Sequence, residues 1–113
     1  MPQPQPYPPP HDRPPVRVTV VEASACHYCA DAHQVLAELA STYPLVVDTV
    51  DARTDVGRLL MAQHRAAMSP LVLLDGAFFS HGRLPRRKLT KVLAGRYGTP
   101  AADAIAGGGR RRG

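Results

Sequence analysis

Two cysteines with two residues between them, Cys26-His27-Tyr28-Cys29, separate a stretch with the pattern of a strand from one with the pattern of a helix. The preceding segment, Val16–Glu22, is short, nearly all apolar and rich in β-branched residues, which favours a central strand covered on both faces. The motif is therefore expected at the N-terminus of a helix that directly follows a strand. This helix should end before Pro44, and its apolar residues recur at helical spacing: Ala32, Val35, Leu36, Leu39 and Tyr43.

The same alternation continues further along the chain. Leu45–Asp51 is predicted to form a second strand. Thr54 and Asp55 then supply an N-cap and a first-turn acid for a second helix. The apolar residues of that helix are Val56, Leu59, Leu60 and Met61.

A hairpin and a last helix complete the pattern. Leu71–Asp75 and Ala77–Ser80 flank Asp75-Gly76, a dipeptide that supplies the positive φ angles of a type I′ turn, so these two strands are predicted to be antiparallel. Pro85 is expected at the first position of the last helix and Gly95 just past its end. One side of that helix is apolar and carries Leu89, Val92 and Leu93.

These elements predict an α/β fold with the order β-α-β-α-β-β-α. A right-handed crossover makes the first two strands parallel, and the hairpin completes a mixed four-stranded sheet with helices on both faces.

The 113 residues leave room for one domain. Eight of the 12 prolines fall in residues 1–15 and four of the nine glycines fall in residues 107–113, so both ends differ from the middle. We expect a disordered proline-rich tail at 1–15, the domain at 16–98 and a flexible Gly/Arg tail at 99–113.

Hydropathy and charge exclude several classes of function. No apolar run approaches the ~20 residues that cross a bilayer, and residues 1–15 lack the apolar centre of a signal peptide, so we expect a soluble, cytoplasmic protein. Residues 16–75 carry a net charge of −3 and residues 76–113 one of +8, but no nucleic-acid-binding module accompanies the basic part. Neither a membrane nor a nucleic acid is expected as a partner.

The two cysteines point to reactivity or metal binding, because a bridge between positions so close would restrain the unfolded chain little. A thiolate is the nucleophile of thiol-disulfide exchange, and motifs of this type lower the pKa from about 8.5 to between roughly 3.5 and 7.5. Cys26 is the candidate nucleophile, and Cys29, one helical turn later, is the candidate resolving thiol. A protonated His27 would favour the thiolate beside it, and Tyr28 would line the substrate-binding site.

Three features stand in an order similar to that of the thioredoxin superfamily: the CHYC motif, Met68-Ser69-Pro70 before the third strand, and the Asp-Gly hairpin. Over Val16–Gly95 the chain resembles that superfamily, and its glutaredoxin-like branch in particular. The resemblance implies a thioredoxin-like fold of glutaredoxin type, a cis bond before Pro70 and a Ser69 backbone that pairs with an extended substrate. It also implies a thiol-disulfide oxidoreductase that serves electron transport without a cofactor.

The resemblance fails at positions that hold substrate in the family. Glutaredoxins usually carry a lysine where Ala23 stands, and Gly-Gly and an acid where this chain has Ser80-His81-Gly82-Arg83-Leu84, which disfavours glutathione as substrate. Thioredoxins usually have an aromatic residue at the place of Ala25 and a buried aspartate at the place of Val20. Glu22 is a nearer carboxylate, either a proton acceptor for the resolving thiol or simply solvated.

The expected substrate is a disulfide-bearing protein or a low-molecular-weight thiol, and the expected reductant is a thiol or dithiol. Two alternatives stay open. Cys26, Cys29 and His33 have the spacing of three ligands of a zinc or iron–sulfur site, but a closed zinc site needs a fourth ligand, which His64 or His81 would have to supply. The chain could also be a non-catalytic domain that binds other proteins.

Overall fold

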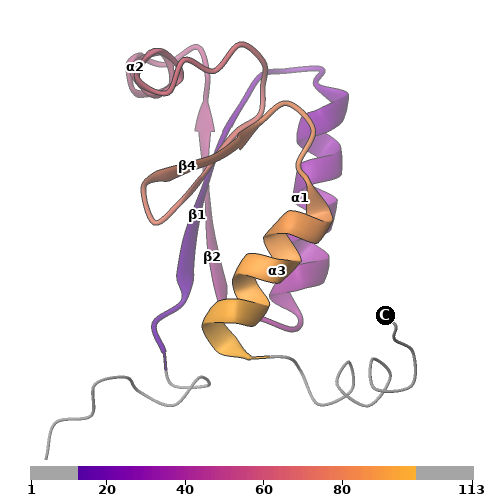
Figure 1. Cartoon of the computed structure of the whole chain (residues 1–113). Coiled ribbons are helices and arrows are strands. Elements are labelled where there is room, and N and C mark those ends of the chain that lie inside the picture. The colour runs from indigo at the N-terminus through magenta and orange to yellow at the C-terminus, as the bar shows by residue number, and fades with distance from the viewer. Residues whose placement is uncertain (1–12, 99–113) are drawn as a thin grey trace, which may run out of the picture. The chain divides into compact units, whose positions relative to one another are not determined.

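The computed structural model describes residues 13–98; apart from residues 13–15, the two predicted tails lie outside the described residues. The elements follow the order that the sequence predicts (Figure 1). Their bounds are β1 Val16–Glu22, α1 His27–Ala40, β2 Leu45–Asp51, α2 Asp55–Gln63, β3 Leu71–Leu74, β4 Ala77–His81 and α3 Arg86–Tyr97. None of the helices in the described part of the chain has the length and apolar character needed to cross a membrane.

The four strands form one mixed sheet in the order β2-β1-β3-β4. β1 runs parallel to β2, in a register that pairs Val16 with Leu45 and Glu22 with Asp51. β3 runs antiparallel to both β1 and β4. The sheet is therefore of the predicted kind, with β2 and β4 as its edges.

β1 is buried on both faces, because alternate side chains of a strand point to opposite sides. Val21 packs with Leu71 and Leu73 on the face that α2 partly covers. Val16, Val18 and Val20 point to the other face, and each is at most 1% exposed. α1 lies on that side of the sheet (Figure 1), so helices cover both faces as predicted. The buried side chains of α1 are Cys29, Ala32, Val35, Leu36 and Leu39.

The turn between β3 and β4 has the predicted type I′ geometry, with φ of 49° at Asp75 and 85° at Gly76. It is also tied to the central strand: the Asp75 N–H donates to Arg17 O at 2.8 Å. In return the Arg17 N–H donates to Asp75 Oδ1 at 2.9 Å. The hairpin is thus anchored to the sheet through its turn as well as through its strands.

The chain divides into two compact units. Residues 15–86 contain the sheet, α1 and α2; the other unit contains α3 from Arg87 onward together with the described residues just before β1. Within this second unit, Tyr97 Oη donates a hydrogen bond to Pro14 O at 2.6 Å. The guanidinium of Arg13 donates to Arg96 O.

Two helix ends differ from the prediction. α3 continues to Tyr97, so Gly95 lies inside the helix instead of past its end. The glycine with left-handed backbone is Gly98, at φ 88°. α1 ends at Ala40, so Tyr43 lies beyond the helix, although it is buried at 4% exposure.

The apolar residues of the later helices are not all buried. In α2, Val56 and Leu59 are exposed, whereas Leu60 and Met61 pack against the sheet cluster. In α3, Val92 is exposed beside two fully buried leucines. The spacing of apolar residues identified the helices correctly, but fewer of those residues are buried than the spacing predicts.

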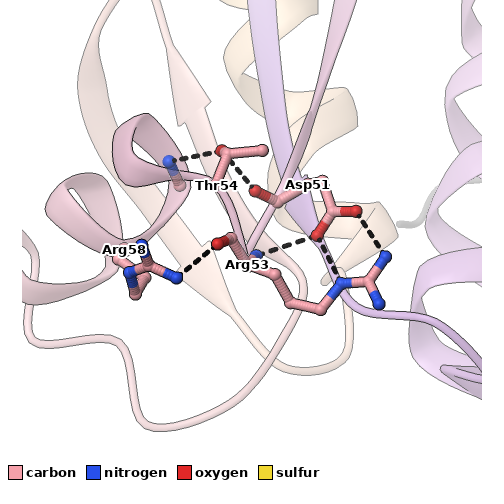
Figure 2. Close-up of polar contacts among 5 residues, drawn as sticks. Asp51, Arg53, Thr54 and Arg58 are labelled. Carbon is pink, nitrogen blue, oxygen red and sulfur yellow. Dashed lines mark hydrogen bonds and ion pairs between the residues drawn. The ribbon is translucent and has the colours of Figure 1, made fainter.

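A polar cluster fixes the turn from β2 into α2 (Figure 2). Thr54 is the N-cap, as predicted: its Oγ1 accepts the Gly57 N–H at 3.0 Å and donates to Asp51 O at 2.7 Å. The Asp51 carboxylate accepts the Arg53 backbone N–H at 2.8 Å and two bonds from the Arg53 guanidinium at 2.9 and 3.2 Å. Arg58 in turn donates to Arg53 O.

Gly57 lies where α2 comes closest to the end of β2. A Cβ at this position would be 2.1 Å from Asp51 O and 2.8 Å from Ala52 Cα. We therefore expect Gly57→Ala to lower the free energy of unfolding by about 1–3 kcal/mol through overpacking, although alanine is the better helix former by roughly 1 kcal/mol.

The matched control is Gly95→Ala, where an added Cβ meets nothing within 4 Å. This change should raise the free energy of unfolding by up to about 1 kcal/mol. Urea unfolding measures both variants, and a stabilised Gly57→Ala protein would contradict the close approach of α2 to β2.

Asp51 should titrate well below an ordinary aspartate. Hydrogen bonds from the Arg53 side chain and backbone lower its pKa from 3.8 to about 2. Because the folded pKa lies below the unfolded one, this carboxylate stabilises the fold fully above about pH 4, and the contribution is lost as the pH falls toward 2. An NMR titration should find this pKa, and Arg53→Gln should raise it part of the way back. An unchanged pKa in that variant would show that Arg53 is not the cause.

Candidate active site

The turn between β1 and α1 presents the first cysteine. Ala25, the residue before it, has a φ of 52°. This left-handed conformation costs a non-glycine residue roughly 1–2 kcal/mol. Strain of this kind persists where the surrounding structure holds it and is common at functional sites. Here it turns the chain out of β1 and places Cys26 at the start of α1.

Cys26 is the N-cap of α1, with extended backbone at φ −108° and ψ 110°. Its Sγ accepts a hydrogen bond from the Cys29 N–H at 3.1 Å, the role that a serine, threonine or aspartate oxygen usually fills. Its carbonyl accepts the Ala30 N–H at 3.1 Å, which begins the helical hydrogen bonds. The sulfur thus lies at the positive end of the helix dipole, beside the Cys29 N–H, which also donates to the Cys26 carbonyl at 3.2 Å.

Cys29 lies in the first turn of α1 and is only 4% exposed, whereas Cys26 is partly exposed. The two are joined in a disulfide, with 5.1 Å between their Cα atoms. The predicted pair is therefore assembled, with one sulfur accessible and the other covered.

The loop before β3 lies against this pair. Cys26 Sγ is 3.8 Å from Ser69 O and 3.6 Å from Ser69 Oγ. The Ser69–Pro70 peptide bond is cis, as the resemblance implies, and Pro70 is buried. The Pro70 carbonyl accepts the Gly82 N–H at 3.0 Å. Ser69 is thus brought to the cysteines, whereas Pro70 lies beneath the surface.

His27 and Tyr28 occupy the first turn of α1, and both are exposed. That turn contains no acidic residue, so no carboxylate in it opposes a negative charge on the neighbouring sulfur. The structure therefore leaves both side chains at the rim of the site.

One pair near the site was not predicted as a pair. His33 Nε2 and Glu22 Oε1 share a hydrogen bond 2.5 Å long, and both side chains are partly exposed. Glu22 also lines a pocket of about 350 Å³, together with Ala23, Ser24, Thr49 and Asp51. The sequence indicates that His33 lies near the site, because it follows Cys29 by one helical turn. That Glu22 is its hydrogen-bond partner depends on how β1 and α1 pack together.

The residues considered as metal ligands are engaged elsewhere. The two sulfurs are joined in a disulfide, and His33 is hydrogen-bonded to Glu22. The rings of His64 and His81 both contact Phe78, at centroid distances of 6.3 and 6.0 Å. Between residues 13 and 98, no three histidine, cysteine or acidic side chains gather in a way that could hold a metal ion.

Known proteins resemble the chain in structure rather than in sequence. No protein-family model matches it, and no curated protein sequence matches it. A mutant thioredoxin from Halobacterium salinarum is 19% identical, with a TM-score of 0.56 over 75% of this chain and 77% of that one. The chain has a thioredoxin-like fold. A Staphylococcus aureus protein of unknown function, 14% identical, matches with a TM-score of 0.51 over 74% of this chain and 92% of that one. A thioredoxin-like fold with a CxxC pair at the start of α1 fits a redox role.

The two cysteines should differ sharply in reactivity once the disulfide is reduced. Cys26 is partly exposed and lies at a helix N-terminus, which favours the thiolate, whereas Cys29 is covered. At about pH 6.5 we expect iodoacetamide to modify Cys26 at least roughly tenfold faster than Cys29. Mass spectrometry of peptides over a time course measures both rates. Equal rates, or a faster Cys29, would contradict the roles that the burial of the two sulfurs indicates.

Proposed function

We propose that the protein is a thiol-disulfide oxidoreductase of the glutaredoxin-like kind, with Cys26 as nucleophile and Cys29 as resolving thiol. The observation that carries the proposal is the position of Cys26 Sγ at the N-cap of α1, 3.1 Å from the Cys29 N–H. A thiolate at that place is stabilised by the donor and by the positive end of the helix. The thioredoxin-like fold supports the same chemistry.

The proposed cycle begins with the reduced protein. The Cys26 thiolate attacks one sulfur of a substrate disulfide, a Cys26–substrate bond forms, and the other substrate sulfur leaves as a thiolate that takes up a proton. Cys29 then loses its proton and attacks the Cys26 sulfur, which releases the second substrate thiol and forms the Cys26–Cys29 disulfide. Two electrons have passed to the substrate, and an external thiol or dithiol returns the protein to its reduced state.

The proposed substrate is a disulfide, either in a protein or formed by a small thiol other than glutathione. Ser69, with its carbonyl 3.8 Å from Cys26 Sγ, would pair its backbone with an extended substrate segment. Ala23 supplies no positive charge to bind a carboxylate of glutathione. Ser80 is buried and carries no acid that could bind the amino group of glutathione. We further propose that the protein serves electron transport in the cytoplasm, where thiol reductants keep such a pair cycling.

Substitution of each cysteine by serine separates the two roles. With dithiothreitol as reductant, Cys26→Ser should abolish reduction of a disulfide-bonded protein, because the attacking sulfur is lost. Cys29→Ser should instead accumulate a mixed disulfide between Cys26 and substrate, because nothing resolves it. Non-reducing mass spectrometry detects the adduct, and circular dichroism confirms that both variants are folded.

Three results would count against the proposal. One is equal activity in wild type and Cys26→Ser, and another is a Cys29→Ser protein that forms no adduct. The third is metal bound by the reduced protein with both thiols protected from alkylation, which would favour the zinc or iron–sulfur alternative instead.

A further inference from the structure

A group of exposed and partly exposed side chains lies between the candidate active site and the edge strand β4. We call it the β4 ridge and define it as Met68, His81, Phe78 and His64. All four lie in the unit that contains the sheet, and Met68 and Phe78 are about half exposed, at 49% and 48%. None of them takes part in the proposed sulfur chemistry.

The ridge begins at the cysteines. Met68 directly precedes Ser69, whose Oγ is 3.6 Å from Cys26 Sγ. Gly82 lies against Met68: a Cβ there would be 3.5 Å from Met68 Sδ, and the backbone is left-handed, with φ at 78°. The Gly82 N–H also donates a hydrogen bond to Pro70 O. Met68 therefore packs against backbone that is hydrogen-bonded to the loop of the candidate active site.

The ridge continues along β4. The register pairs Leu71 with His81 and Leu73 with Phe78, so His81 and Phe78 point to the same face of the sheet as those two leucines. That is the face that α2 partly covers, and His64 is the C-cap of α2. The Phe78 ring lies 6.0 Å from the His81 ring and is stacked 6.3 Å from the His64 ring.

The flanking imidazoles restrict the motion of Phe78 while leaving about half of it open. An aromatic side chain that is already held loses little conformational freedom when a partner covers it, and such residues dominate binding at protein surfaces. The ridge also adjoins Ser69, where substrate is proposed to bind: Met68 precedes Ser69 and lies against Gly82, the residue that follows His81. A small disulfide needs only the contacts at Cys26 and Ser69, whereas a polypeptide is long enough to extend along the ridge.

We infer that the β4 ridge is a docking surface for a polypeptide substrate with an apolar side chain near its disulfide. The inference rests on the proposed function and narrows its substrate class from disulfides in general to disulfides in polypeptides. The apolar side chain covers Phe78 while the substrate sulfur meets Cys26.

The test compares Phe78→Ser with a matched control, Val46→Ser. Val46 is 39% exposed on β2, the other edge strand. It pairs with Arg17 near the start of β1, whereas the cysteines follow the end of that strand. Each protein reduces two peptide disulfides that are identical except for phenylalanine or serine beside the cysteine, and also bis(2-hydroxyethyl) disulfide, with dithiothreitol as reductant.

Wild type should prefer the phenylalanine peptide, and Phe78→Ser should lower kcat/KM for it roughly five- to tenfold, mainly through KM. Phe78→Ser should leave the rate with bis(2-hydroxyethyl) disulfide unchanged, which also shows that the variant is folded. Val46→Ser should leave all three rates unchanged.

The contrary outcomes are distinct. If wild type reduces none of the three disulfides, the proposed function fails and the inference fails with it. If wild type reduces all three and Phe78→Ser changes none of the rates, only the inference is wrong. If sedimentation shows that Phe78→Ser dissociates a dimer while the peptide preference persists, the ridge joins two copies of the chain and does not bind substrate.

Discussion

The hydrogen bond from the Cys29 N–H to Cys26 Sγ is the contact on which the candidate chemistry depends. A helix begins with N–H groups that have no partner within the helix, and here a sulfur takes the place of the usual oxygen acceptor. The bond therefore serves two purposes. It completes the N-terminus of α1, and it lies beside the atom that is proposed to carry negative charge in the reduced protein. A shift of the helix start by one residue would remove both.

The position of this helix end is fixed by the core rather than by the motif. β1 is central, with Val20 and Val21 buried on opposite faces, so its end at Glu22 has little freedom to move. The left-handed Ala25 then turns the chain into the helix. Val20 stands where thioredoxins usually have a buried acid, and the acid that β1 offers near the motif is Glu22 at its end. Glu22 is hydrogen-bonded to His33 and partly exposed.

Most of the fold could be predicted because its signals are local. The β-branched run of β1 and the Asp75-Gly76 dipeptide specify a strand and a turn by themselves, and the structure has both. Predictions failed where the outcome depends on distant partners. Nothing near Gly95 in the sequence shows that α3 continues past it, and nothing near Leu59 shows that the side chain stays outside the core. The cysteines were found by spacing, whereas the bond between Glu22 and His33 depends on the packing of a helix against a strand.

Substrate choice in such a site must come from the surroundings of the cysteines, because every disulfide offers the same S–S bond to the same nucleophile. Two ways of selecting are charge and shape. Charge is weakly developed here: Ala23 is neutral, and the first turn of α1 contains no acid. Shape is better developed, because Met68 rests on Gly82 and Phe78 is held between two rings. Apolar contacts are not screened by ions, whereas exposed charges are screened within about 10 Å at 0.1 M salt. A protein that selects by shape keeps its preference as ionic strength changes, and one that selects by charge does not.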